Sequence, residues 1–184
     1  MVLIFLLGAL MTGFDDDVEL KELNFRLGKE IAGLHFESRQ EYKVDGAGYS
    51  VRYANKMCKV DLFVYDGNLS NISDGNASKE VDEERKKACS ELPKAQKKGL
   101  YKNVNRMNGD LPLSKEIQEK FTVDGFTFDI SGGACKSYVL VTGFKKHFIK
   151  IRVTQYVVDG KSNDKEILDF LAEIVRQIDV NSNN

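Results

Sequence analysis

The sequence predicts an α+β fold, an antiparallel β-sheet of about six or seven strands flanked by helices. Two patterns support this prediction. Apolar and polar residues alternate over several short runs that turn-forming residues separate, which is typical of half-buried strands. A segment near the C-terminus, 163–178, instead repeats apolar residues at helical spacing and needs a sheet to cover. The length of 184 residues fits a single domain.

The chain begins with thirteen almost wholly apolar residues, which acidic residues follow at 15–17. This run is too short for a bilayer span of roughly 20 residues but fits the apolar part of a secretory signal. No basic residue precedes it and no Ala-x-Ala site follows it, so a buried first strand or helix is the alternative. We therefore expect a signal-like segment at 1–13 and a single α+β domain at 14–184. The mature protein would be periplasmic or otherwise exported, without a stable membrane span, or cytoplasmic if the segment is no signal.

The segment 15–31 contains both strand and helix signals. From residue 34 onward the pattern becomes sheet-like, and Asp45-Gly46 and Asn55-Lys56 separate the first runs. Alternation predicts strands at 39–43, 49–54, 58–65, 119–123, 126–131, 138–141 and 148–156. The dipeptide Asp124-Gly125 predicts a hairpin turn between the fourth and fifth of these strands.

Two helices are predicted. The first begins near Ser78, with acidic residues in its first turns, and Pro93 interrupts it. The basic stretch at 94–102 that follows fits a solvated helix face better than a docking site for an acidic partner. The closing helix begins near Asn163, which forms a capping-box pattern with Glu166.

Charge and motif content exclude several classes of function. The 27 basic and 28 acidic residues leave a net charge of -1, which disfavours nucleic-acid binding. The three cysteines have no C-x-x-C spacing, and the chain lacks a Walker phosphate loop. The loop at 66–78 lacks the glycine and glutamate that an EF-hand needs. We expect no metal and no cofactor.

Cys58 and Cys135 each stand in front of an apolar run, so both could lie at strand starts within disulfide reach. Three free thiols are the alternative. Cys135 also follows Gly132-Gly133, and His147 could serve as its base, which would make a small thiol-dependent enzyme. A turn followed by a buried cysteine explains the same residues more simply.

Three cations, Arg52, Lys150 and Arg152, are candidate ligand-binding residues because each alternates with apolar residues on a predicted strand. If a helix leaves their face of the sheet partly open, they could bind a carboxylate or phosphate, as in an anionic small-ligand carrier. Salt bridges to acids on a covering element are the alternative.

Three stretches resemble a known family: 32–34, then 49–53 with 60–66, then 137–143 with 148–152. Their order and spacing are similar to those of uncharacterised, mostly exported bacterial proteins with the PsbP-like α/β/α sandwich fold. The resemblance covers roughly residues 28–178. Better-known members of that fold, an extrinsic subunit of the photosystem II oxygen-evolving complex and a Ran-binding import factor, act by binding proteins. The resemblance implies no catalytic motif. It implies a non-catalytic binding or assembly module of the bacterial envelope, with protein partners.

Overall fold

The computed structural model describes residues 17–182 apart from 109–111, 159, 161 and 163. Its first elements are β1 (Asp17–Leu20), the 3-10 turn η1 (Lys21–Leu23), β2 (Phe25–Gly28), β3 (Glu30–Ile31), β4 (Leu34–Glu41), β5 (Tyr49–Ala54) and β6 (Cys58–Tyr65). The remaining ones are α1 (Lys79–Lys97), β7 (Lys102–Arg106), α2 (Lys115–Lys120), β8 (Thr122–Ile130), β9 (Gly133–Phe144), β10 (His147–Tyr156) and α3 (Asp164–Asn181).

The centre of the molecule is an antiparallel sheet of eight strands in the order β3-β4-β5-β6-β10-β9-β8-β7. The strands β1 and β2 pair separately. This architecture confirms the predicted α+β class, with eight strands in the main sheet where the sequence indicated six or seven. The two strands that alternation did not reveal, β3 and β7, are the edge strands, which are short or mostly polar and bury little apolar surface.

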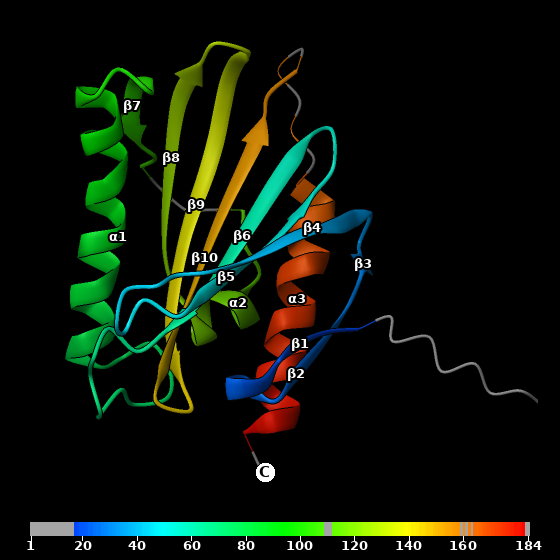
Figure 1. Ribbon diagram of the computed structural model, residues 1–184. Helices are drawn as coiled ribbons and strands as arrows, with labels where there is room; N and C mark the ends of the chain where they lie inside the picture. Colours follow the sequence, from blue (N-terminus) through cyan, green and yellow to red (C-terminus); the bar gives the residue numbers. More distant parts are fainter. Residues whose placement is uncertain (1–16, 109–111, 159, 161, 163, 183–184) are drawn as a thin grey trace, which may run out of the picture.

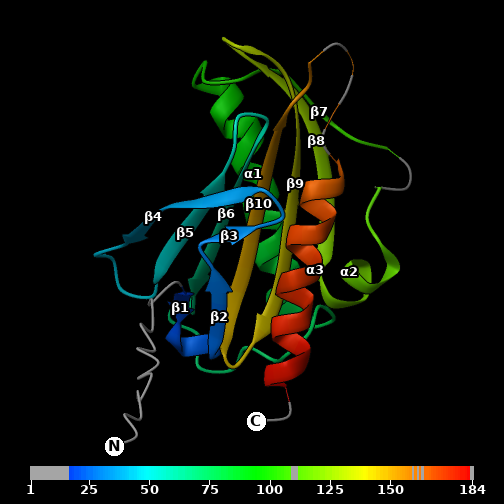
Figure 2. The same ribbon diagram turned by 90° about the vertical axis from the view of Figure 1, so that its right-hand side faces the viewer.

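Helices cover both faces of the sheet, so the fold is an α/β/α sandwich (Figures 1 and 2). Helix α1 packs on one face, while α2, α3 and the β1–β2 hairpin pack on the other. Ser78 caps α1 as predicted, because its Oγ accepts a hydrogen bond from the Val81 N–H at 3.2 Å. The predicted closing helix is confirmed as α3, which buries Phe170, Leu171 and Ile174 completely.

Strand alternation sorts the apolar side chains into two cores. On the α3 side, Val60, Leu62 and Val64 of β6 belong to the larger cluster, which also contains the β1–β2 hairpin. On the α1 side, a smaller cluster contains Val139 and Val141 of β9 together with side chains of α1 and β8. The sheet therefore separates two cores. Alternate residues of a strand point to opposite faces, so the position of a residue along its strand decides which core its side chain joins.

Two local predictions are wrong. Asp124-Gly125 makes no hairpin turn, because β8 continues through both residues and the segment 115–120 forms α2 instead of entering a strand. The buried Asp124 carboxylate is tolerated inside β8 because two arginines neutralise it. Pro93 also does not interrupt the first helix, which runs on to Lys97 with Pro93 exposed on its surface.

The expected signal-like segment at 1–13 lies outside the described residues. None of the helices in the described part of the chain has the length and apolar character that crossing a bilayer requires.

Candidate functional site

The α1 side of the sheet is only half covered. Helix α1 contacts β7, β8 and β9 and reaches the end of β6 at Tyr65, and in the described ranges no helix packs over this face of β4 and β5 (Figure 1). The two faces of β5 therefore differ in burial. On the α1 side Ser50 and Arg52 are partly exposed, whereas the alternate residues on the α3 side are buried: Tyr49, Val51 and Tyr53. We call the α1-side surface of β5, β6 and β10 the uncovered face. Its main side chains are Ser50, Arg52, Lys59, Asp61, Phe63, Lys150 and Arg152.

The three cations that the sequence singles out lie together on the uncovered face. Arg52 on β5 lies opposite Asp61 on β6, and Asp61 in turn lies opposite Arg152 on β10. Lys150 is two residues from Arg152 on the same strand and so shares its face. The structure thus brings the three cations onto one face, and their binding of a carboxylate or phosphate stays a prediction.

Arg52 is neutralised by Asp61. Its Nε donates a hydrogen bond of 2.6 Å to Asp61 Oδ1, which raises the pKa of the Arg52 guanidinium. Lys59 Nζ lies 3.7 Å from the other carboxylate oxygen. The Asp61 side chain is only 10% exposed, against 43% for Arg52. Asp61 thus has two cationic partners on its own face and is satisfied.

Arg152 has no such partner among the residues that the structure describes. Its Nη2 donates to the Tyr101 hydroxyl at 3.0 Å, and its guanidinium carbon lies 5.5 Å from the centroid of the Tyr101 ring. Its Nε is buried and has no acceptor, and no described carboxylate lies within ion-pair distance. Tyr101 is itself held in place by stacking on Phe128, with ring centroids 4.4 Å apart. A partly buried cation with an unsatisfied donor and no anion costs free energy, so this arginine is a candidate to bind one.

Lys150 forms part of the floor of a surface pocket of about 510 Å³, which fits the size range of small-ligand sites. Phe63 and Tyr65 complete the floor, and Lys150 Nζ lies 4.7 Å and 5.5 Å from their ring centroids. The Lys150 side chain is 13% exposed, and its ammonium lies 3.4 Å from Glu91 Oε1 on α1. We call this cavity the Lys150 pocket.

The α1 wall of the Lys150 pocket is held by Glu84. The Tyr65 hydroxyl donates to Glu84 Oε1 at 2.5 Å, and Lys87 Nζ lies 3.2 Å from Oε2. Burial, followed by the Glu84 charge, raises the pKa of Tyr65 far above its ordinary value. Both carboxylate oxygens are therefore occupied, and Glu84 braces the helix against the floor.

The opposite wall is the β4–β5 hairpin, residues 42–48, which glycines hold against the end of β6. Gly48 has φ +58°, and a methyl group there would lie 2.0 Å from the Val64 carbonyl oxygen. The Gly67 N–H donates to the Gly46 carbonyl at 2.8 Å. These contacts need residues without side chains, so the wall is preformed.

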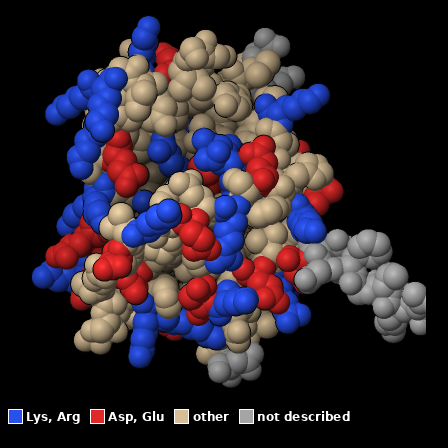
Figure 3. All heavy atoms as spheres, in the orientation of Figure 1, with Lys and Arg blue, Asp and Glu red and all other residues tan. Residues whose placement is uncertain are grey.

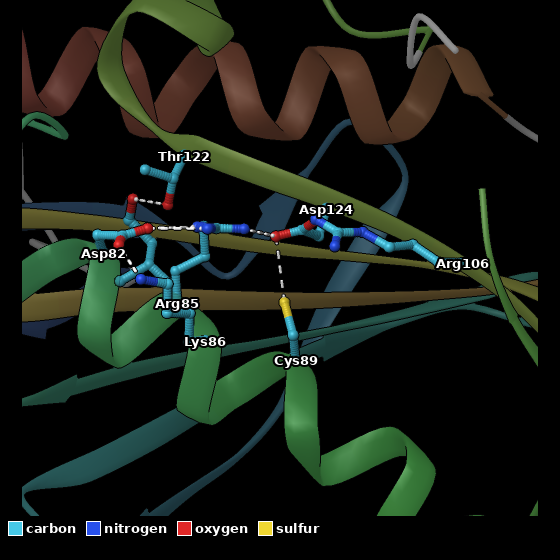
Figure 4. Close-up of polar contacts among 8 residues, drawn as sticks. Asp82, Arg85, Lys86, Cys89, Arg106, Thr122 and Asp124 are labelled. Atoms are coloured by element: carbon cyan, nitrogen blue, oxygen red, sulfur yellow. Dashed lines mark hydrogen bonds and ion pairs between the residues drawn. The ribbon is translucent and has the colours of Figure 1, made fainter. Parts of the chain in front are cut away.

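A second polar cluster lies under α1, away from the pocket (Figure 4). Asp124 on β8 is 3% exposed and accepts a 2.7 Å bond from Arg85 Nη1, a bond from Arg106 Nη2 and a 3.2 Å bond from the Cys89 thiol. Burial raises the pKa of the Cys89 thiol. Because every partner of Asp124 belongs to the protein, we interpret the cluster as a clamp that joins α1 and β7 to β8.

Cys58 and Cys135, for which the sequence left both a disulfide and free thiols open, are both free and buried in the structure. Cys58 lies opposite Gln155, and Gln155 lies opposite Lys136, so Cys135 is one residue out of register with Cys58. This offset places the two thiols on opposite faces of the sheet, in the two separate cores.

The alternative pair Cys135 and His147 is also separated. Cys135 lies opposite Tyr156 at one end of the β9–β10 hairpin, and His147 lies opposite Phe144 at the other end. Nine residue steps along a strand span about 30 Å. Burial raises the pKa of the Cys135 thiol, which disfavours a reactive thiolate. These residues do not form a nucleophile and its base.

Sequence reasoning missed the residues that frame the site: Asp61 as a partner of Arg52, Glu84 and Glu91 on α1, and Tyr101. Only Asp61 had a local signal, an acid between the apolar Val60 and Leu62, because a charge inside a buried strand needs a partner. In the described ranges, no group of three or more His, Cys, Asp and Glu residues could hold a metal ion.

Comparisons of the chain with protein-family models, with curated proteins and with solved structures each gave no significant match. The geometry of the uncovered face and of the Lys150 pocket is therefore the basis for the functional argument.

Proposed function

We propose that this protein is a non-catalytic binding module, and that the uncovered face binds an acidic group of a protein partner. The observation that supports this most directly is Arg152, a partly buried cation with an unsatisfied Nε and a tyrosine hydroxyl as its hydrogen-bond partner. A partner carboxylate can bond to the guanidinium with two parallel hydrogen bonds. Binding would supply the anion that Arg152 lacks among the described residues.

The composition of the uncovered face fits a protein interface. Arginine and aromatic residues are enriched at interfaces, and here Arg52, Arg152, Phe63 and Tyr101 occur together. Basic and acidic side chains are intermixed over most of the side of the molecule shown in Figure 3, with a group of basic ones at its upper left. Such a surface favours a specific partner over a polyanion.

Export to the bacterial envelope is a further part of the proposal. It rests on the apolar composition of residues 1–13 and on the resemblance to exported proteins with a PsbP-like fold. The test is fractionation of the native host followed by mass spectrometry of the intact protein. An envelope protein whose mass lacks about the first thirteen residues is expected. A full-length cytoplasmic chain would contradict export without affecting the binding proposal.

Site-specific photo-crosslinking in the native host tests the binding surface. A photoreactive benzoylphenylalanine replaces Ser38 or Lys59, which border the uncovered face, or the controls Ala172 and Lys115 on exposed surfaces of α3 and α2. Adducts of defined mass are expected from the first pair only, and Arg152→Gln should abolish them. Equal adducts at all four positions, or adducts that survive Arg152→Gln, would refute this surface as the binding site.

A second candidate function, carriage of a small organic anion, is supported by the Lys150 pocket. This cavity is large enough for a small ligand and has a cation in its floor.

A further inference from the structure

Lys150 has hydrogen-bonding capacity that the protein does not use. Its ammonium has three N–H donors, and among the described residues one oxygen lies within hydrogen-bond distance, Glu91 Oε1 at 3.4 Å. The aromatic rings of Phe63 and Tyr65 attract the charge but accept no strong hydrogen bond. The Lys150 side chain is 13% exposed and lines the Lys150 pocket, so an acceptor for the remaining donors would come from a molecule in that pocket.

Glu91 is a displaceable partner. Its side chain is 47% exposed on α1, and its contact with Lys150 is long for a charge-assisted hydrogen bond. A single long contact to a half-exposed carboxylate contributes little to stability. The Glu91 carboxylate thus occupies the position that a ligand carboxylate would take, and it can swing into solvent.

The pocket also restricts the rest of the ligand. Phe63 is partly exposed in the floor, and Tyr42 lines the β4–β5 side, so a flat apolar or aromatic body has rings to pack against. Glu84, Glu91 and Asp45 surround this cavity. These three carboxylates outnumber the two ammonium groups of the pocket, those of Lys87 and Lys150. The excess negative charge disfavours a ligand with two negative charges, such as a phosphate.

From these contacts we propose that the Lys150 pocket binds a small aromatic monocarboxylate, whose carboxylate replaces that of Glu91 on Lys150 while its ring packs on Phe63. The proposal rests on the second candidate function, carriage of a small anion, and not on the binding of a protein partner through Arg152.

The test uses the full-length protein and three probes: 3-phenylpropionate, its neutral amide and phenylphosphonate, which is doubly charged at pH 8. Isothermal titration calorimetry gives the affinity, and amide chemical shifts locate the probe. We expect 3-phenylpropionate to bind at least about tenfold more tightly than either analogue, since only it offers a single negative charge to Lys150. The shifts should be confined to the pocket lining, in β6 and the turn after it, β10, α1 and the β4–β5 hairpin.

Two substitutions should change the affinity in opposite directions. Lys150→Met should weaken 3-phenylpropionate binding at least about tenfold, whereas Glu91→Gln should strengthen it severalfold because it removes the competing carboxylate. Lys146→Met, at an exposed position of the β9–β10 turn, is the matched control and should have no effect. Because Glu91 is exposed, its variant keeps the test valid even if Lys150→Met unfolds the protein.

Three results would each overturn the proposal: no binding of 3-phenylpropionate at 10 mM (about the weakest affinity of interest), equal binding of the amide, or weaker binding by Glu91→Gln. Arg152→Gln separates the two ideas. It should abolish crosslinking to a partner and leave the probe affinity unchanged, so failure of one proposal is distinguishable from failure of the other.

Discussion

Asp61 and Arg152 lie directly opposite each other on β6 and β10, yet the Asp61 carboxylate bonds to Arg52 on β5, at 2.6 Å. One carboxylate thus lies between two guanidinium groups and neutralises only one of them. The consequence is that Arg152, on the uncovered face, has a tyrosine hydroxyl as its partner and no anion within the part of the chain that the structure describes.

This asymmetry predicts opposite effects for two equivalent substitutions. Arg152→Met should leave the free energy of unfolding unchanged or raise it by about 1 kcal/mol, because it removes a buried donor without an acceptor. Arg52→Met should lower it by about 1 kcal/mol, because Asp61 then keeps only the distant Lys59. Urea denaturation at pH 7 measures both. A similar loss in both variants would show that Arg152 is a structural residue.

The clamp under α1 predicts a large loss for Asp124→Ala. Arg85 would then be left partly buried without the buried carboxylate it binds, and we expect a cost of about 3 kcal/mol in the free energy of unfolding. Asp82→Ala removes an exposed carboxylate from the same arginine and is the matched control. Its urea midpoint should stay close to that of the wild type. Equal losses in the free energy of unfolding for the two variants would mean that burial of Asp124 does not strengthen its ion pair with Arg85.

Cys58 predicts a dependence of stability on alkaline pH. Burial, with the nearby Glu166 charge, raises its pKa to about 11 in the folded state, whereas an unfolded thiol titrates near 8.5. The unfolded state therefore loses its proton first, and stability falls as the pH rises from about 9 to about 11. Cys58→Ala should remove about 2 kcal/mol of this decline. Urea denaturation at pH 8 and pH 10.5 compares the two proteins, and parallel declines would contradict the assignment.

The free state of the cysteines predicts a simple mass change. Alkylation with iodoacetamide in denaturant, without a reductant, should modify all three cysteines. Alkylation of the folded protein at neutral pH should be slow, because burial raises the pKa of each thiol. A single modified cysteine in denaturant would indicate a disulfide, and if it joined Cys58 to Cys135, one of the two would have to change faces of the sheet.

The hairpin wall of the Lys150 pocket predicts a strong effect at Gly48. An alanine there combines a left-handed φ with a methyl group 2.0 Å from a carbonyl oxygen, and we expect a loss of about 3 kcal/mol. Gly132→Ala is the control, because a methyl group there meets no atom within 4 Å. It should change stability by less than about 0.5 kcal/mol. Thermal or urea unfolding of both variants decides whether the wall is as rigid as its contacts indicate.

The sequence by itself determined the fold class and most of the elements. Alternation in β6 and β10 identified two central strands and the faces of their side chains, because the period of two is a property of the extended backbone. The apolar stripe of α3 likewise required a sheet beneath it. The same periodicity placed Lys150 and Arg152 on one face before any contact was known.

Only the tertiary structure decided how the strands align and which charges meet. Asp124-Gly125 has the composition of a turn, but Arg85 and Arg106, which are 39 and 18 residues away, allow the aspartate to lie inside β8. A shift of one residue between β6 and β9 separates Cys58 from Cys135. Pairing, register and helix coverage depend on contacts between distant segments, which local composition does not encode. For that reason the cations were predictable, whereas their partners were not.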